Sequence, residues 1–297
     1  MIIDNIAYSS NSTRSVNDIK IGDTAFSVDN LNIDLIESNQ HLKLGSIVNS
    51  VTGINSVDFL NDIDVIDPLK MQLTKVKYVS RSQEVNNYFS ANVVASFESL
   101  VSMNNTYGPL DFDFDLKHIR ADKFSLVADL LAAQTKLNES EYNANYETMV
   151  EKLKTEMTPI LIESPVAQIN KLTLKVPSGL ININGVLTTH GFESADMLEQ
   201  NQFIQKIYAN VNLSVPKPVL GYLLLLQMKY FLSAGNAQMD EQSSQALSKL
   251  VNILLDNQLQ SWLKKGYIKE EAESVFSSNV RFESGAVYLN NLPTHNE

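Results

Sequence analysis

The sequence predicts an α+β fold, in which two pairs of α-helices pack on a large, curved, mainly antiparallel β-sheet arranged as a meander. Most of the first 120 residues form short runs that alternate apolar and polar side chains, as half-buried strands do. Two helical stretches follow, then strands, then two more helical stretches and a C-terminal hairpin. No linker rich in Pro, Gly or Ser divides the chain, so we expect a single elongated domain over residues 1–297. The two successive blocks of strands and paired helices, 1–163 and 164–297, indicate a loose duplication.

The N-terminal part is expected to form successive strands. The opening stretch fits one strand, and residues 19–38 ("IKIGDTAFSVDNLNIDLIES") fit two strands joined by a hairpin turn at Asp29–Asn30. Further strands are expected at residues 42–51, 71–80 and 87–103.

The first helix pair is expected between residues 121 and 164. In residues 121–137 the apolar side chains recur at helical spacing, and a second apolar stripe runs from Tyr142 to Leu161. Asn138 and Glu141 form a capping pair at the start of the second helix, and Pro165 ends it.

The second half repeats this order. Residues 166–176 and 180–189 form a hairpin around "PSG", and residues 203–215 ("FIQKIYANVNLSV") fit a strand despite a helical-looking start. Pro216 and Pro218 open a helix that is apolar on nearly every side, and residues 243–265 form an amphipathic helix that ends at Gly266. A terminal hairpin turns at Ser284–Gly285.

Composition excludes several classes of function. The net charge is -11 and the pI is near 4.9, which argues against nucleic acid as a partner and against electrostatic docking on anionic lipid heads. The absence of cysteine excludes disulfides, thiolate nucleophiles and Cys-ligated metals. The start resembles no signal peptide, and the most apolar run, residues 219–232, is too short for a membrane span and is interrupted by Lys229.

Three aspartates at every second position, in "DFDFDL", are the first candidate for chemistry. On a strand, Asp111, Asp113 and Asp115 share one face, opposite Phe112 and Phe114. The pattern favours the solvated side of a half-buried strand, and the alternative is a weak cation site or an acidic rim. The same two interpretations apply to "LNDIDVID", with Asp62, Asp64 and Asp67.

No other residues form a recognisable catalytic or metal site. The four histidines (His41, His118, His190 and His295) are scattered and lack zinc-ligand spacing, and no P-loop, G-x-S-x-G, G-x-G-x-x-G or H-E-x-x-H motif is present. We therefore expect no cofactor, no metal and no enzymatic activity.

The apolar helix after Pro218 is the stronger candidate for binding. One interpretation is a central core helix; the other is the lining of an apolar groove that holds an acyl chain or a partner helix. The expected groove residues are Leu220, Leu223, Leu224, Leu226, Met228 and Phe231.

The C-terminal part resembles the YdgA-like bacterial envelope proteins, a family of unknown function (domain of unknown function 945). That family has a Gly-Tyr after its last long helix, matched here by Gly266 and Tyr267. Its terminal hairpin is matched by Gly285, Val287, Leu289, Asn290 and Pro293, with Asn291 standing where the family usually has glycine. The resemblance implies a periplasmic, β-rich body tethered to the inner membrane of Gram-negative bacteria by an N-terminal helix. This chain lacks that helix, so we expect a soluble portion of such a protein.

Three hypotheses follow for the function. The first is a non-enzymatic envelope protein that binds a lipid or another amphiphile in an apolar groove. The second is a structural or scaffolding module that binds envelope proteins through sheet edges or by forming oligomers. The third is a hydrolase without a recognisable motif. The sequence leaves the ligand, the partner and the oligomeric state open.

Overall fold

The computed structural model describes residues 2–35, 69–102, 105–134, 139–233, 241–272 and 274–294. Within these ranges, the description of residues 33–35, 69–70, 131–134, 139–146, 226–227, 229–233 and 241–246 is limited to the backbone. The first seven strands are β1 (Ile2–Arg14), β2 (Lys20–Leu35), β3 (Leu69–Val85), β4 (Tyr88–Phe97), β5 (Ser99–Ser102), β6 (Asn105–Tyr107) and β7 (Leu110–Arg120). The remaining strands are β8 (Val166–Val176), β9 (Gly179–Thr189), β10 (Ile207–Pro216), β11 (Lys269–Ala272), β12 (Val275–Glu283), β13 (Ala286–Leu289) and β14 (Leu292–Pro293). The helices are α3 (Ala121–Gln134), α4 (Glu139–Ile162), α5 (Gln200–Lys206), α6 (Lys217–Ser233) and α7 (Glu241–Lys265), with a 3₁₀ turn at Ser194–Met197.

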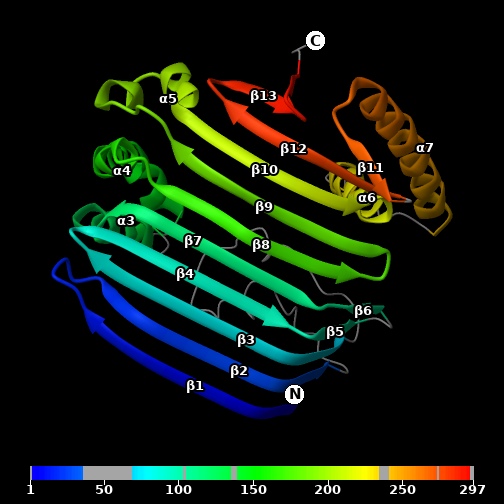
Figure 1. Ribbon diagram of the computed structural model, residues 1–297, viewed down its shortest axis with the longest axis horizontal. Coiled ribbons are helices and arrows are strands. Elements are labelled where there is room, and N and C mark those ends of the chain that lie inside the picture. Colours follow the sequence, from blue (N-terminus) through cyan, green and yellow to red (C-terminus); the bar gives the residue numbers. More distant parts are fainter. Residues whose placement is uncertain are drawn as a thin grey trace.

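The described strands form one open, curved, 14-stranded sheet, and the predicted α+β class is confirmed (Figure 1). The main path runs β1-β2-β3-β4-β7-β8-β9-β10-β12-β13-β14, and every strand pair recorded along it is antiparallel. Because most neighbours in the sheet are also neighbours in sequence, the path is the expected meander.

The predicted hairpin turn at Asp29–Asn30 is wrong, because β2 runs without a break through both residues. Asn30 pairs with Asp4 of β1 on one side and with Thr74 of β3 on the other. The Asp29 carboxylate accepts a hydrogen bond of 2.9 Å from the Asn5 amide, which satisfies this polar side chain within the sheet. The ladder on both sides thus overrides a local turn signal. The strand expected at residues 42–51 lies outside the described residues.

The strand predicted over residues 203–215 starts later than expected. Residues up to Lys206 form the short helix α5, and β10 begins at Ile207. The apolar alternation therefore predicts the strand correctly, and the helical-looking residues before it form a helix.

The predicted end of the last long helix is confirmed. Gly266 ends α7 with φ +75°, and the amide of Tyr267 donates to the Trp262 carbonyl at 2.9 Å.

The two faces of the sheet differ sharply in polarity. Directly paired residues of an antiparallel sheet point to the same face, so the register traces each face across the strands. One such row crosses eight strands and contains only apolar or aromatic residues: Tyr8, Phe26, Tyr78, Ala95, Phe112, Leu172, Ile183 and Leu213. We call the surface that carries this row the apolar face. The opposite surface, which carries Asp111, Asp113 and Asp115, is the polar face.

The two helix pairs pack on the apolar face at opposite ends of the strands. The helix α3 follows β7 and α6 follows β10. Three antiparallel pairings separate these two strands, so the C-terminal end of β7 and that of β10 lie at opposite ends of the strands (Figure 1). On the α3–α4 side, Phe89, Ile119 and Ile160 form a buried cluster, with Ala91 and Leu116 against it. On the other side, α6 and α7 bury Leu255, Leu259 and Phe276. Among the described residues, these two clusters of buried side chains are separate from each other.

Candidate functional site: the apolar face of the sheet

An open groove lies on the apolar face where β1, β2, β3, β4 and β7 run side by side. Its volume is about 590 Å³, within the usual range of about 300–1,000 Å³ for small-molecule sites. Its lining residues are Tyr8, Thr24, Phe26, Val76, Lys77, Tyr78, Ser80, Ala95, Ser96, Phe97 and Leu110. Aromatic rings form much of the wall, and hydroxyl groups of serine and threonine lie among them. This composition suits an apolar chain that carries a polar group.

The apolar surface extends well beyond this groove. The row from Tyr8 to Leu213 spans seven strand spacings, or about 34 Å at 4.8 Å per spacing. Its members on β2 to β10 are half-buried, while Tyr8 on β1 is 67% exposed. The row thus reaches the edge of the sheet at β1, so the apolar surface continues to that edge.

The residues predicted to line a groove on α6 are separated by the structure. Leu220 and Leu224 pack against the buried cluster between α6, α7 and β12. Leu223 is 55% exposed, and Met228 is half-buried. The side chains of Leu226 and Phe231 lie outside the described part of the chain. The core interpretation therefore fits Leu220 and Leu224, while a groove along α6 stays a prediction.

The three aspartates lie together on the polar face, each beside a hydrogen-bond donor. Two asparagine amides bridge Asp113 and Asp115: Asn92 donates to them at 2.8 and 2.9 Å, and Asn170 at 3.2 and 3.0 Å. Lysines pair with the outer two, Lys117 with Asp115 at 2.7 Å and Lys171 with Asp111 at 2.9 Å. Bonds from Asn170 and then Lys117 lower the pKa of Asp115 to about 2. The three carboxylates are thus already bonded to amide and ammonium groups of neighbouring side chains, which fits the polar side of a strand better than an open cation site.

A ladder of asparagines continues this polar face toward the C-terminal strands. The Asn279 amide donates to the side-chain oxygens of Asn210 at 2.6 Å and Asn212 at 2.9 Å. The amide of Asn212 in turn donates to Asn184 at 2.9 Å. These asparagines thus form cross-strand hydrogen bonds on one face of the sheet.

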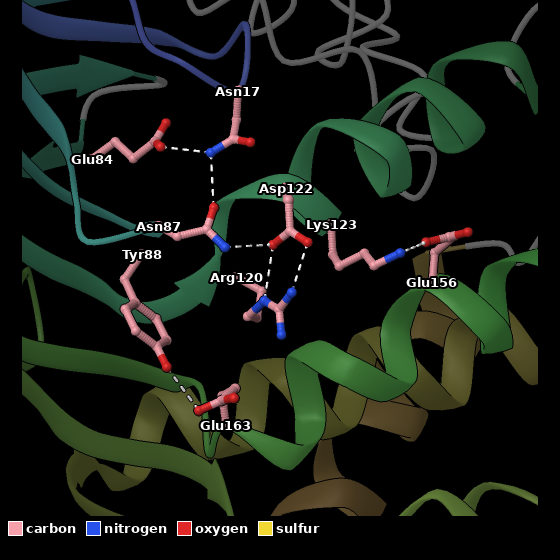
Figure 2. Close-up of polar contacts among 9 residues, drawn as sticks. All are labelled: Asn17, Glu84, Asn87, Tyr88, Arg120, Asp122, Lys123, Glu156 and Glu163. Carbon is pink, nitrogen blue, oxygen red and sulfur yellow. Dashed lines mark hydrogen bonds and ion pairs between the residues drawn. The ribbon is translucent and has the colours of Figure 1, made fainter.

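A second polar network ties the hairpin ends to the first helix pair (Figure 2). The Asn17 amide donates to Glu84 at 2.6 Å and to the Asn87 side chain at 2.8 Å. Asn87 donates to Asp122 at 3.0 Å, and Asp122 also receives two bonds from the Arg120 guanidinium, at 2.9 and 2.7 Å. The Arg120 bonds, with help from Asn87, lower the pKa of Asp122 to about 2. The network therefore anchors two turns of the sheet at the start of α3.

A pocket of about 640 Å³ near the end of α4 contains the nearest approach to an acid–base arrangement. The Tyr88 hydroxyl donates to Glu163 at 2.8 Å, as Figure 2 shows, and His118 also lines the pocket. The bond to Glu163 raises the pKa of Tyr88, which keeps the phenol protonated and makes it a donor rather than a base. The geometry thus fits a structural bond between β4 and α4 better than a catalytic base.

The remaining sequence candidates are dispersed. His190 stacks on Tyr208 with ring centroids 5.0 Å apart, while His41, His295 and the acidic run from Asp62 to Asp67 lie outside the described residues. Among the described residues, no group of three His, Asp or Glu side chains could hold a metal ion. None of the described helices combines the length and the apolar character needed to cross a membrane.

The sequence does not predict the groove on β1, β2, β3, β4 and β7. Its signal was the alternation in residues 19–38 and 71–80, where Phe26 and Tyr78 fall at the same phase of their strands. The register that places these two rings side by side depends on β2 running straight, and the expected turn at Asp29–Asn30 concealed it.

Comparison with known proteins gives one match. Residues 1–295 match the family described as bacterial protein of unknown function (DUF945). Neither a curated protein nor a solved structure matches the chain. The match extends beyond the C-terminal hairpin that first suggested the resemblance, and with nearly the whole chain covered, the protein belongs to this bacterial family of unknown function.

Proposed function

We propose that this protein is a non-enzymatic cell-envelope protein that binds a lipid or another amphiphile along the apolar face of its sheet. The observation that carries the proposal is the uninterrupted row of eight apolar or aromatic residues from Tyr8 to Leu213. A long apolar strip bordered by polar groups marks a binding surface more often than a plain exterior.

The shape of the site favours a chain-like ligand. Phe26, Tyr78 and Phe97 lie on three neighbouring strands, so the groove that they line runs across the strands. An acyl chain can lie along such a groove, while the hydroxyls of Thr24 and Ser80 offer hydrogen bonds to its polar end. The periplasmic location and the tether to the inner membrane are part of the proposal and rest on the family resemblance alone.

The test compares a bound lipid across two matched variants. Ala95 lines the groove, and its neighbour Val94 points to the polar face of the same strand, where it is 37% exposed. Ala95→Asp places a charge in the groove, and Val94→Asp places the same charge one residue away on the opposite face. Gently purified protein is extracted with organic solvent and analysed by mass spectrometry beside a mock purification.

We expect a near-stoichiometric lipid in the unmodified protein and in Val94→Asp, and its loss in Ala95→Asp. Circular dichroism checks that both variants are folded. If the unmodified protein yields no lipid above the mock purification, even after incubation with bacterial lipid vesicles, the proposal is refuted. Equal loss of lipid in both variants would place the lipid away from the groove.

A scaffolding role through sheet edges remains the second candidate, because β1 leaves one long edge exposed along its whole length. It predicts protein partners and no retained lipid, so the same extraction separates the two candidates.

A further inference from the structure

The two outer edges of the sheet are built in opposite ways. One edge ends in β13, with four residues, and β14, with two residues that include Pro293 (Figure 1). Short strands and proline are common devices that prevent edge-to-edge pairing. The other edge is β1, which has 13 residues, all of them exposed, and contains neither lysine nor proline. Within the described part of the chain, β2 is the only strand that pairs with β1.

The two charged residues of β1 are complementary when the strand pairs antiparallel with a second copy of itself. Its only charged residues are Asp4 and Arg14, one near each end. When two copies of one strand pair antiparallel about a two-fold axis, the numbers of opposed residues add to a constant. A constant of 18 places Asp4 opposite Arg14 of the second copy, and the symmetry repeats this contact. Ser9 then lies on the axis, opposite itself.

We propose that β1 pairs antiparallel with β1 of a second copy of this chain, in the register centred on Ser9. Residues 4–14 of each copy take part. The regular part of the pairing is residues 6–12, because Asn5, with φ +51° and no partner in the β1–β2 ladder, interrupts the extended backbone next to Asp4. Arg14 already pairs with Asp18 at 2.6 Å. Because a guanidinium has five donors, it can keep that partner and also bind Asp4 of the second copy.

This register joins the two apolar faces. Because the constant is even, each even-numbered residue of one copy lies opposite an even-numbered residue of the other. Directly opposed residues of an antiparallel pair share a face. Tyr8, the outermost member of the apolar row, is then opposite Ser10 of the second copy, and both rows lie on the same side of the joined sheet. The apolar surface would double to about 70 Å across, at about 4.8 Å per strand. The pairing rests on the edge alone and stands whether or not this surface binds a lipid.

Cross-linking tests both the pairing and its register. The chain has no cysteine, so single-cysteine variants are clean probes. On-axis residues of an antiparallel pair have Cβ atoms about 4.5–5.5 Å apart, close to the separation that a disulfide needs. Ser9→Cys should therefore form a covalent dimer under mild oxidation. Thr13→Cys, on the same strand and also exposed, should not, because Thr13 lies opposite Asn5 of the second copy and far from its own counterpart.

Oligomeric mass and a charge swap complete the test. Light scattering after size exclusion should give the unmodified chain a mass of twice 33.2 kDa at high-micromolar concentration. Ser9→Lys and Ser9→Asp each oppose like charges on the axis and should raise the dimer Kd by about twofold to fivefold. An equimolar mixture of the two should restore dimers.

A monomer at every concentration overturns the proposal. Equal cross-linking of Ser9→Cys and Thr13→Cys also overturns it, because that result indicates random collision. Failure of the mixed charge variants to dimerise would exclude the register centred on Ser9.

Discussion

The two faces of the sheet are formed by the same strands, yet their side chains are stabilised in different ways. On the polar face, neighbouring strands supply each other with partners, such as Asn170 for Asp113 and Asn279 for Asn210. On the apolar face, side chains can be satisfied only by burial. The helix pairs bury two parts of that face, around Phe89 and around Phe276. Cross-strand hydrogen bonds therefore satisfy many side chains of the polar face within the sheet, although Arg281 Nε is buried without a partner. The apolar row between the clusters remains half-buried.

This difference separates the surfaces that contribute most to folding stability from the surface on which we propose binding. A residue in either helix-covered cluster contributes to folding through full burial, while a half-buried ring in the open row contributes less and stays accessible. The polar face adds cross-strand bonds of modest net value. Substitutions on the three kinds of surface should consequently differ in size and in pH dependence.

The largest effect is expected in the α3–α4 cluster. Phe89 is 6% exposed and stacks on Phe124, with ring centroids 4.6 Å apart. Phe89→Ala should lower the free energy of unfolding by about 3–5 kcal/mol, because it removes a buried ring and leaves a cavity. Phe112→Ala, in the half-buried open row, should cost clearly less. Urea unfolding followed by circular dichroism measures both. Equal losses would show that the open row is as well packed as the core.

An intermediate effect is expected from acid, through Asp115 on the polar face and Asp122 at the start of α3. Both have a pKa of about 2 in the folded chain, below the value of about 3.9 in an unfolded chain. Their stabilisation is therefore fully present above about pH 4 and is lost as the pH falls toward 2. Each should contribute about 1–2 kcal/mol, allowing for partial solvent screening.

The measurement is the free energy of unfolding in urea at several pH values between 7 and 2.5. Asp115→Asn should flatten the acid part of the curve, because one group that binds a proton on unfolding is removed. Asp111→Asn is the matched control on the same face, since its carboxylate is half exposed and, among the described residues, pairs with Lys171 alone. A curve that is as steep in Asp115→Asn as in the unmodified chain would refute the assignment.

The fold could be predicted further than the site, for reasons seen in particular residues. Alternation in residues 166–189 and the glycine at 266 are local signals, and local signals specified the hairpin and the end of α7. The groove depends on register, which brings Phe26 beside Tyr78 from a distance of 52 positions in the chain (78 − 26). No local pattern contains that pairing. The run of leucines on α6 is a local signal of the same kind, and the structure places Leu220 and Leu224, partly buried, against the cluster of α6 and α7.

The smallest effect is expected at the exposed margin of the polar face. Lys171 and Asp111 form an ion pair at 2.9 Å, with about half of each side chain exposed (55% and 50%). In such a pair, water screens the attraction, and ordering two side chains costs conformational entropy. Lys171→Ala should therefore change the free energy of unfolding by less than about 0.5 kcal/mol, and added salt should reduce the difference further. A loss above about 1 kcal/mol, measured by urea unfolding at low salt, would mean that Lys171 supports the neighbouring Asp113–Asn170 bridge as well. The polar face would then act as one cooperative network rather than as a set of separate cross-strand pairs, and the contribution of each pair to stability would depend on the others.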